Sequence, residues 1–154
     1  MKLPPLLFAL ALTACATTSA TPQDAFWQAL SSHCGKAFAG RLVSNEAPDA
    51  DMRGAAMVMH VRECSAARIA IPFHVQRADG SWDRSRTWVL TRVGTLDNPG
   101  RGFRLKHDHR HEDGKPDAAT LYGGDTALPG SAGAQEFPVD AESIALFKAE
   151  GRTA

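Results

Sequence analysis

Residues 102–111, Gly-Phe-Arg-Leu-Lys-His-Asp-His-Arg-His, decide the expected fold. Apolar and charged residues alternate here, and successive side chains of a β-strand point to opposite faces of the sheet. The stretch therefore predicts a half-buried strand whose outward row is charged. Its inward row begins apolar and ends in imidazoles: Phe103, Leu105, His107, His109 and His111.

Outward from this strand, the chain repeats the same pattern of short apolar runs separated by turn residues. In residues 68–76, Ile69, Ile71, Phe73 and Val75 share one parity, and Asp79-Gly80 is typical of a following turn. We predict strands at 37–44, 55–64, 68–76, 86–93, 102–111, 118–122 and 135–139. Gly123-Gly124 is expected to break a strand, because paired glycines there indicate a bulge or corner.

Helix signals stand at the two ends of this strand series. Thr21-Pro22 predicts a helix start, with apolar residues at helical spacing up to Gly35. Asp140 predicts the cap of a short helix that ends near Gly151.

The strands follow one another without a long crossover, which favours antiparallel pairing. We expect a mainly β fold of six to seven strands, either a small antiparallel barrel or a strongly curved sheet, with an N-terminal helix and a short C-terminal helix. In size and order it is similar to lipocalin-type barrels, although it lacks their Gly-x-Trp and has one strand fewer.

The first residues are typical of a targeting signal rather than of the folded domain. Residues 1–14 carry one lysine and then a short apolar run, as secretory signals do. Leu12-Thr13-Ala14-Cys15 resembles the lipobox of bacterial lipoproteins, which implies lipidation of Cys15; ordinary cleavage a few residues later is the alternative. Ala16 rather than Asp after the cysteine favours an outer-membrane anchor facing the periplasm. Residues 15–21 would then be the lipidated cysteine and its tether, and 22–154 a single β-rich domain.

Composition excludes two classes of protein. The 154 residues contain 17 basic and 17 acidic side chains, whereas a nucleic-acid partner normally requires a basic surface. With 44% hydrophobic and 22% charged residues, the chain also differs from disordered proteins.

Cys34 and Cys64 remain after the lipobox. In an oxidising compartment they are expected to form a disulfide, with two separate buried thiols as the alternative.

The histidine row is the chemical feature of the sequence. Neighbours on one strand face stand about 6.6 Å apart, so two of the three imidazoles could share a zinc or another transition-metal ion. A third ligand would come from another strand. The candidates for the site are His107, His109 and His111, joined by His60, His74, Glu112 or Asp125. An anion site or a catalytic imidazole in a pocket is a second interpretation, and imidazoles hydrogen-bonded at the rim of the core are a third.

Arginines fall on successive predicted strands, and the guanidinium group suits carboxylate or phosphate ligands. Arg62, Arg84 and Arg86 are the candidate anion-binding residues. The alternative is a cross-strand ladder of charge pairs, because acidic partners are available in Glu63, Asp83 and Asp108. No Gly-x-Ser-x-Gly motif is present, and the sequence does not pair Ser85 or Ser143 with a histidine.

Several runs of the domain resemble a family of uncharacterised secreted bacterial proteins. They are Met59–Cys64, Pro72–Val75, Asp83–Trp88 and Leu105–Gly114. The resemblance implies no activity and transfers no catalytic residues.

Three functions follow as hypotheses. The first is an envelope lipoprotein that binds a small ligand or a metal ion in a pocket near the histidine-rich strand. The second is a hydrolytic enzyme that uses a pocket histidine as a general base, which requires that histidine to lie beside a carboxylate and a nucleophile. The third is a structural or assembly protein of the cell envelope. The membrane, through the lipid, and a small-molecule or metal ligand are the expected partners, and the oligomeric state stays open.

Overall fold

The computed structural model describes residues 20–95 and 98–152. The expected signal segment, Cys15 and the tether up to residue 19 lie outside these residues. In chain order the elements are α1 (Pro22–Ser31), β1 (Ala37–Gly40), the 3₁₀ helix η1 (Ala47–Met52), β2 (Met57–His60), β3 (Arg68–Gln76), β4 (Trp82–Thr95), β5 (Asn98–His109), β6 (Tyr122–Asp125) and α2 (Ala141–Ala149). None of the described helices is long and apolar enough to cross a membrane.

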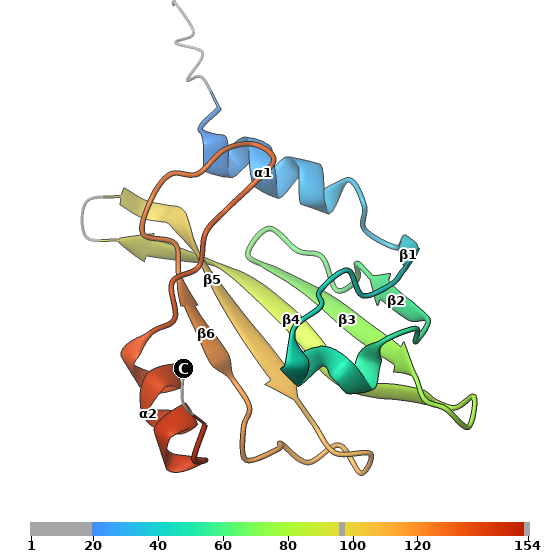
Figure 1. The fold of residues 1–154 in the computed structure, drawn as a ribbon. Helices are drawn as coiled ribbons and strands as arrows, with labels where there is room; N and C mark the ends of the chain where they lie inside the picture. Colours follow the sequence, from blue (N-terminus) through green and yellow to red (C-terminus); the bar gives the residue numbers. More distant parts are fainter. Residues whose placement is uncertain (1–19, 96–97, 153–154) are drawn as a thin grey trace, which may run out of the picture.

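The six strands form one antiparallel sheet in the order β1-β2-β3-β4-β5-β6, so each strand pairs with its neighbours in sequence (Figure 1). The expected mainly β fold with two flanking helices is confirmed. Within the described residues no ladder joins β1 to β6, and the sheet is open rather than closed into a barrel. The site therefore does not lie at the mouth of a barrel.

Several predicted strand boundaries are wrong. Only four residues of 37–44 form β1, and four of 55–64 form β2, whereas β4 extends well beyond 86–93 at both ends. Residues 118–121 are irregular, and β6 begins at Tyr122 and includes the glycine pair that was expected to break it. Residues 135–139 are not a strand.

Close backbone contacts explain the glycines in β6. A Cβ atom on Gly124 would lie 1.8 Å from the carbonyl oxygen of Pro138, and one on Gly123 would lie 1.9 Å from that of Leu105. The segment between β6 and α2 thus runs against β6, and Asp140 N donates to Gly123 O at 2.9 Å. Figure 1 shows this segment passing α1 before it returns to α2.

Helix α1 begins where its sequence predicts. Thr21 and Asp24 form a capping box, in which each side chain accepts a hydrogen bond from the backbone N–H of the other. The helix places Trp27 on the sheet, with its ring 5.4 Å from that of Phe103. Arg92 covers the Trp27 ring at 4.7 Å and pairs with Asp24 at 3.1 Å, so the apolar contact is sealed by a cation.

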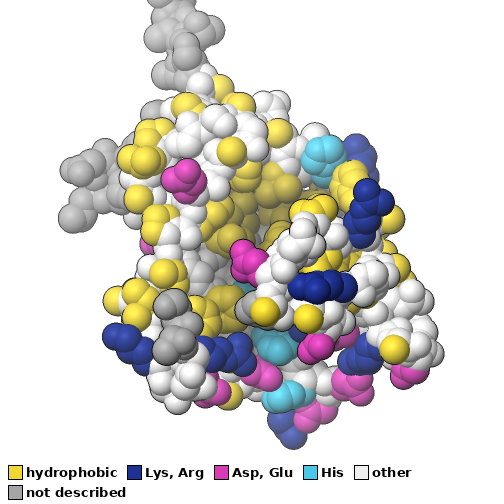
Figure 2. Space-filling view, viewed as in Figure 1, with side chains coloured by type: hydrophobic (Ala, Val, Ile, Leu, Met, Phe, Trp, Pro, Cys, Tyr) yellow, Lys and Arg dark blue, Asp and Glu magenta, His cyan; other side chains and the backbone are white. Residues whose placement is uncertain are grey.

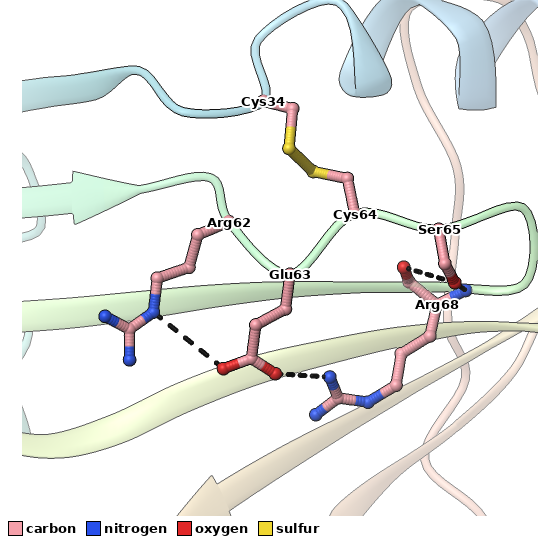
Figure 3. The surroundings of a disulfide bond; sticks show 6 residues. All are labelled: Cys34, Arg62, Glu63, Cys64, Ser65 and Arg68. Atoms are coloured by element: carbon pink, nitrogen blue, oxygen red, sulfur yellow. Dashed lines mark hydrogen bonds and ion pairs between the residues drawn. A yellow bond between two sulfur atoms is a disulfide. The ribbon is translucent and has the colours of Figure 1, made fainter.

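The core lies between α1 and one face of the sheet, called here the inner face. Its buried members are Trp27, Val61, Ile69, Ile71, Leu90 and Phe103. Phe103 is 0% exposed and His107 on the same strand 9%, whereas Arg104 between them is exposed, so the predicted alternation is confirmed. The expected disulfide Cys34–Cys64 is also present and joins the chain just after α1 to the turn before β3 (Figure 3).

Candidate functional site

A β-bulge in β4 shapes the candidate site. Phe73 of β3 pairs with Arg86 and Val75 pairs with Asp83, so β4 has one residue more than β3 over this stretch. Bulges redirect side chains and often border functional sites. Here the bulge brings Ser85 to the inner face beside Arg86, where its Oγ lies 3.0 Å from Nε2 of His109 on β5.

Asp117 completes a row of three side chains. Its Oδ2 lies 3.8 Å from Nδ1 of His109, on the other side of the ring from Ser85. Asp117 N donates to His109 O at 2.9 Å, and His109 N donates to Thr120 Oγ1 at 2.8 Å, so the segment after β5 is held against the strand. The order serine, histidine, carboxylate is the one in which an imidazole can accept the proton of a hydroxyl.

Charged side chains surround the Ser85 hydroxyl. Arg86 Nη1 lies 3.2 Å from Ser85 Oγ and donates to it, so the hydroxyl proton is shared between two acceptors, His109 Nε2 and the Asp83 carboxylate. Arg86 also pairs with Asp83. Burial opposes ionisation of that carboxyl, but hydrogen bonds from Ser85 and Arg86 outweigh it and lower the pKa of Asp83 to about 2.

Asp117 is a carboxylate at neutral pH. The backbone N–H of Ala119 donates to it at 2.8 Å and lowers the pKa of Asp117, and His109 and His111 act in the same direction. His111 Nε2 lies 3.8 Å from the same carboxylate oxygen. Asp117 therefore faces two of the three histidines that the sequence singled out.

These side chains border a pocket of about 510 Å³. We call it the polar pocket; its lining residues are Arg77, Trp82, Asp83, Arg84, Ser85, His109, Arg110, His111, Glu112 and Asp117. Arg77 pairs with Glu112 at 3.2 Å, so Glu112, a predicted metal-ligand candidate, forms an ion pair here. Arginines and carboxylates are equal in number in this lining, so the pocket offers no strong excess of either charge.

An apolar groove of about 390 Å³ lies on the same inner face. Phe38, Met57, Met59 and Phe73 line it together with residues 39–44. Figure 2 shows this side of the molecule hollowed, with hydrophobic side chains inside the hollow and charged and histidine side chains gathered below it.

Strand register places the groove and the polar pocket next to each other. Directly paired residues share a face, and they form one row across the sheet: Phe38, Met59, Phe73, Arg86 and His109. The apolar half of the row lines the groove and the polar half leads to the polar pocket. Trp88 follows in the next row; it stacks on Phe73 at 5.9 Å and is 41% exposed. The inner face is thus amphipathic where α1 does not cover it.

His107 belongs to the core rather than to the polar pocket. Its ring lies 4.7 Å from that of Tyr122 and 5.8 Å from that of His109. Burial, and then the nearby His109 and Arg86, lower the pKa of His107 to about 4. The three imidazoles of the row therefore occupy three environments: buried, half-buried and exposed.

The remaining candidates lie on the outer face or in ion pairs. His60 and His74 face outward on β2 and β3. Arg62 and Arg84 lie near His74, where burial and their charges lower its pKa, and Arg84 also lines the polar pocket. Arg62 also pairs with Glu63 at 3.9 Å (Figure 3). Arg86 faces inward, apart from these two. Asp125 pairs with Arg104 at 2.7 Å.

The predicted metal ligands do not gather in one place. Among residues 20–95 and 98–152, no group of three or more His, Cys, Asp or Glu side chains is arranged to hold a metal ion. Of the predicted residues, His109, His111, Glu112, Arg84 and Arg86 lie in or beside the polar pocket.

Sequence reasoning missed Asp117 and left Ser85 unassigned. The hairpin turn at Asp113-Gly114, followed by Pro116, signals that the chain turns back after β5, so a carboxylate two or three residues later was a traceable candidate. Ser85 depends on the bulge, which the alternation of β4 does not reveal.

Fold and site together define an open-sheet, mainly β protein with an amphipathic inner face. The chain matches no protein-family profile, no curated protein and no solved structure. Its resemblance to a family of secreted bacterial proteins stays a prediction.

Proposed function

We propose that this protein is a lipid-anchored protein of the bacterial envelope that binds a small amphipathic ligand on its inner face. The observation that carries the proposal is the row from Phe38 to His109, in which an apolar groove continues into a polar pocket. The apolar part of the ligand lies in the groove and against Trp88. Its polar, uncharged end lies among the hydrogen-bonding side chains of the polar pocket.

Size and charge support a small neutral ligand. The two hollows have volumes of about 510 and 390 Å³, which suits molecules rather than macromolecules. Because arginines and carboxylates are balanced in the polar pocket, a hydroxyl-bearing end group is favoured over a strongly charged one. The side chain of Trp88 is 41% exposed and supplies apolar surface that a bound ligand would remove from water.

The proposed location rests on the lipobox-like residues 12–15, with Cys15 lipidated and the domain facing the periplasm from the outer membrane. Incorporation of labelled palmitate into the protein, lost in Cys15→Ser, is the expected result. Equal labelling of the variant would contradict the anchor.

Binding is tested with 1-O-hexylglycerol, an ether that has a short apolar chain and an uncharged hydroxyl-bearing end. The full-length protein in phospholipid nanodiscs is titrated by calorimetry, with empty nanodiscs as the blank. We expect saturable binding that weakens in Phe38→Ala, whose side chain lines the groove, and in Trp88→Ala, whose ring stacks on Phe73 of the groove. Binding is unchanged in Leu128→Ala, since Leu128 is also exposed but lines neither hollow. Absence of saturable binding by the unchanged protein up to millimolar ligand would overturn the proposal.

Zinc is added in a separate titration, because His109 and His111 face one carboxylate. If the first hypothesis holds in its metal form, zinc raises the thermal stability after chelator treatment and His111→Gln removes the effect. If zinc does not change the stability, the metal form of the hypothesis is wrong.

A further inference from the structure

We propose that Ser85 is a nucleophile and that the polar pocket hydrolyses carboxylic esters whose acyl chain lies in the apolar groove. This inference rests on the proposed amphipathic ligand and names its reactive group. Ser85 and His109 are the catalytic residues, and Asp117 is a positioning residue that acts through His109.

The geometry provides a hydroxyl and an imidazole in hydrogen-bond contact, with a carboxylate near the other side of the ring. Ser85 Oγ is 3.0 Å from His109 Nε2, within reach of proton transfer. Asp117 Oδ2 faces the opposite ring nitrogen at 3.8 Å and favours the tautomer that carries its proton on Nδ1. That tautomer leaves Nε2 free to accept the hydroxyl proton.

Arg86 supplies positive charge at the reacting atoms. Its Nη1 is 3.2 Å from Ser85 Oγ, so a carbonyl group attacked by Oγ comes within reach of the same guanidinium. A fixed cation there stabilises the negative charge that develops on the carbonyl oxygen. Asp83 holds the guanidinium in place through its ion pair with Arg86.

The reaction balances without any further reagent than water. Ser85 Oγ attacks the ester carbonyl carbon while His109 Nε2 takes the hydroxyl proton. The C–O bond to the alcohol breaks, and His109 returns the proton to the departing oxygen. Water then attacks the acyl-serine with His109 again as base, which releases the carboxylic acid and restores the hydroxyl.

The row across the sheet places the acyl chain. Phe73 pairs with Arg86, and Arg86 pairs with His109. Because neighbouring strands are about 4.8 Å apart, the backbone of Phe73 lies about one strand spacing from that of Arg86, the neighbour of Ser85, and about 10 Å from that of His109. An acyl chain attached at Ser85 crosses this one strand spacing and enters the groove when it carries several methylene groups, whereas an acetyl group ends before the groove. The site therefore favours esters of medium-chain acids over acetate esters.

Hydrolysis of p-nitrophenyl hexanoate and p-nitrophenyl acetate by the full-length protein in nanodiscs tests the inference. We expect saturable turnover, a kcat/KM at least about ten times higher for the hexanoate, and a loss of about 100-fold or more in Ser85→Ala and in His109→Gln. Ser32→Ala and His33→Gln, which lie at the end of α1, keep the unchanged rate. Asp117→Asn lowers kcat more than it raises KM and alters the pH profile of the rate.

A fluorophosphonate probe gives an independent readout. It is expected to modify Ser85 and no other serine, as located by mass spectrometry. Labelling spread over several serines, or hydrolysis that persists in Ser85→Ala, would overturn the assignment. Binding of 1-O-hexylglycerol separates the two proposals: if the ether binds but the ester is not hydrolysed, only the nucleophile fails, and if neither occurs, both fail.

Discussion

Strands β4 and β5 carry two different environments on one face of the sheet. Beneath α1, Leu90 and Phe103 are 2% and 0% exposed and belong to the apolar core cluster, with the Arg92 guanidinium over the Phe103 ring. At the other end of the same strands, Ser85 and His109 lie beside an open pocket with charged walls. The bulge in β4 and the cover above the strands together make this difference.

The cover is α1, and its position depends on few contacts. Trp27 places the helix over Phe103, and the disulfide Cys34–Cys64 fixes the chain that leaves the helix. The helix is ten residues long and covers only one end of the sheet (Figure 1). A short helix on a larger sheet thus creates both a core and an uncovered, amphipathic surface.

The largest effect on stability is expected at the covered end. Phe103→Ala removes a ring that stacks on Trp27 and is 0% exposed, and we expect the free energy of unfolding to fall by about 3–5 kcal/mol. Trp88→Ala, at 41% exposure on the same face, is expected to lower it by about 1 kcal/mol. Urea unfolding measures both. Equal losses would mean that the two ends of the face are equally buried.

Removal of the disulfide is expected to have the next largest effect. The bond closes a loop with a sequence separation of 30, for which the chain-entropy relation gives about 3–4 kcal/mol. Cys34→Ala combined with Cys64→Ala, compared with the oxidised protein by urea unfolding, checks this value. A loss below about 1 kcal/mol would show that α1 is held by packing alone.

His107 stands at the boundary between the two environments and makes stability depend on pH. Its pKa is lowered to about 4 from 6.5, so between these values the unfolded chain binds a proton that the folded protein does not. The contribution of His107 to the free energy of unfolding is fully present above pH 6.5. It is lost as the pH falls to 4, by about 3 kcal/mol. His107→Gln should flatten this decline, whereas His33→Gln should leave it. An unaltered decline in His107→Gln would contradict the role of burial.

The smallest effect is expected in the polar pocket. Ser85→Ala removes hydrogen bonds to His109 and Arg86 at a partly buried position, and we expect a loss of about 1 kcal/mol or less. Thermal unfolding of the variant beside the unchanged protein measures it. A loss of stability as large as that of Phe103→Ala would show that Ser85 belongs to the core. Loss of hydrolysis in Ser85→Ala could then result from unfolding, and labelling of Ser85 by the fluorophosphonate probe would decide whether it is the nucleophile.

Much of the fold could be predicted because its signals are local. The cap at Thr21, the turn at Gly80 and the alternation in β3 and β5 depend on neighbouring residues. The strand predicted at 135–139 failed because its apolar residues pack against the core as an irregular segment, with Phe137 beside the buried cluster. The position of β6 was predicted wrongly because its two glycines are required by close backbone contacts with Pro138 and Leu105. These contacts come from a later segment of the chain and from a neighbouring strand, so the local sequence does not reveal them.

The sequence by itself determined the inward row of β5, the two helices and the pair of cysteines, because periodicity, capping and composition are properties of short segments. Only the tertiary structure decided that the sheet stays open and that a bulge in β4 turns Ser85 toward His109. It also brought Asp117 back to the imidazole. These features depend on the register between strands, which is set by packing of the whole inner face rather than by the residues of any one strand.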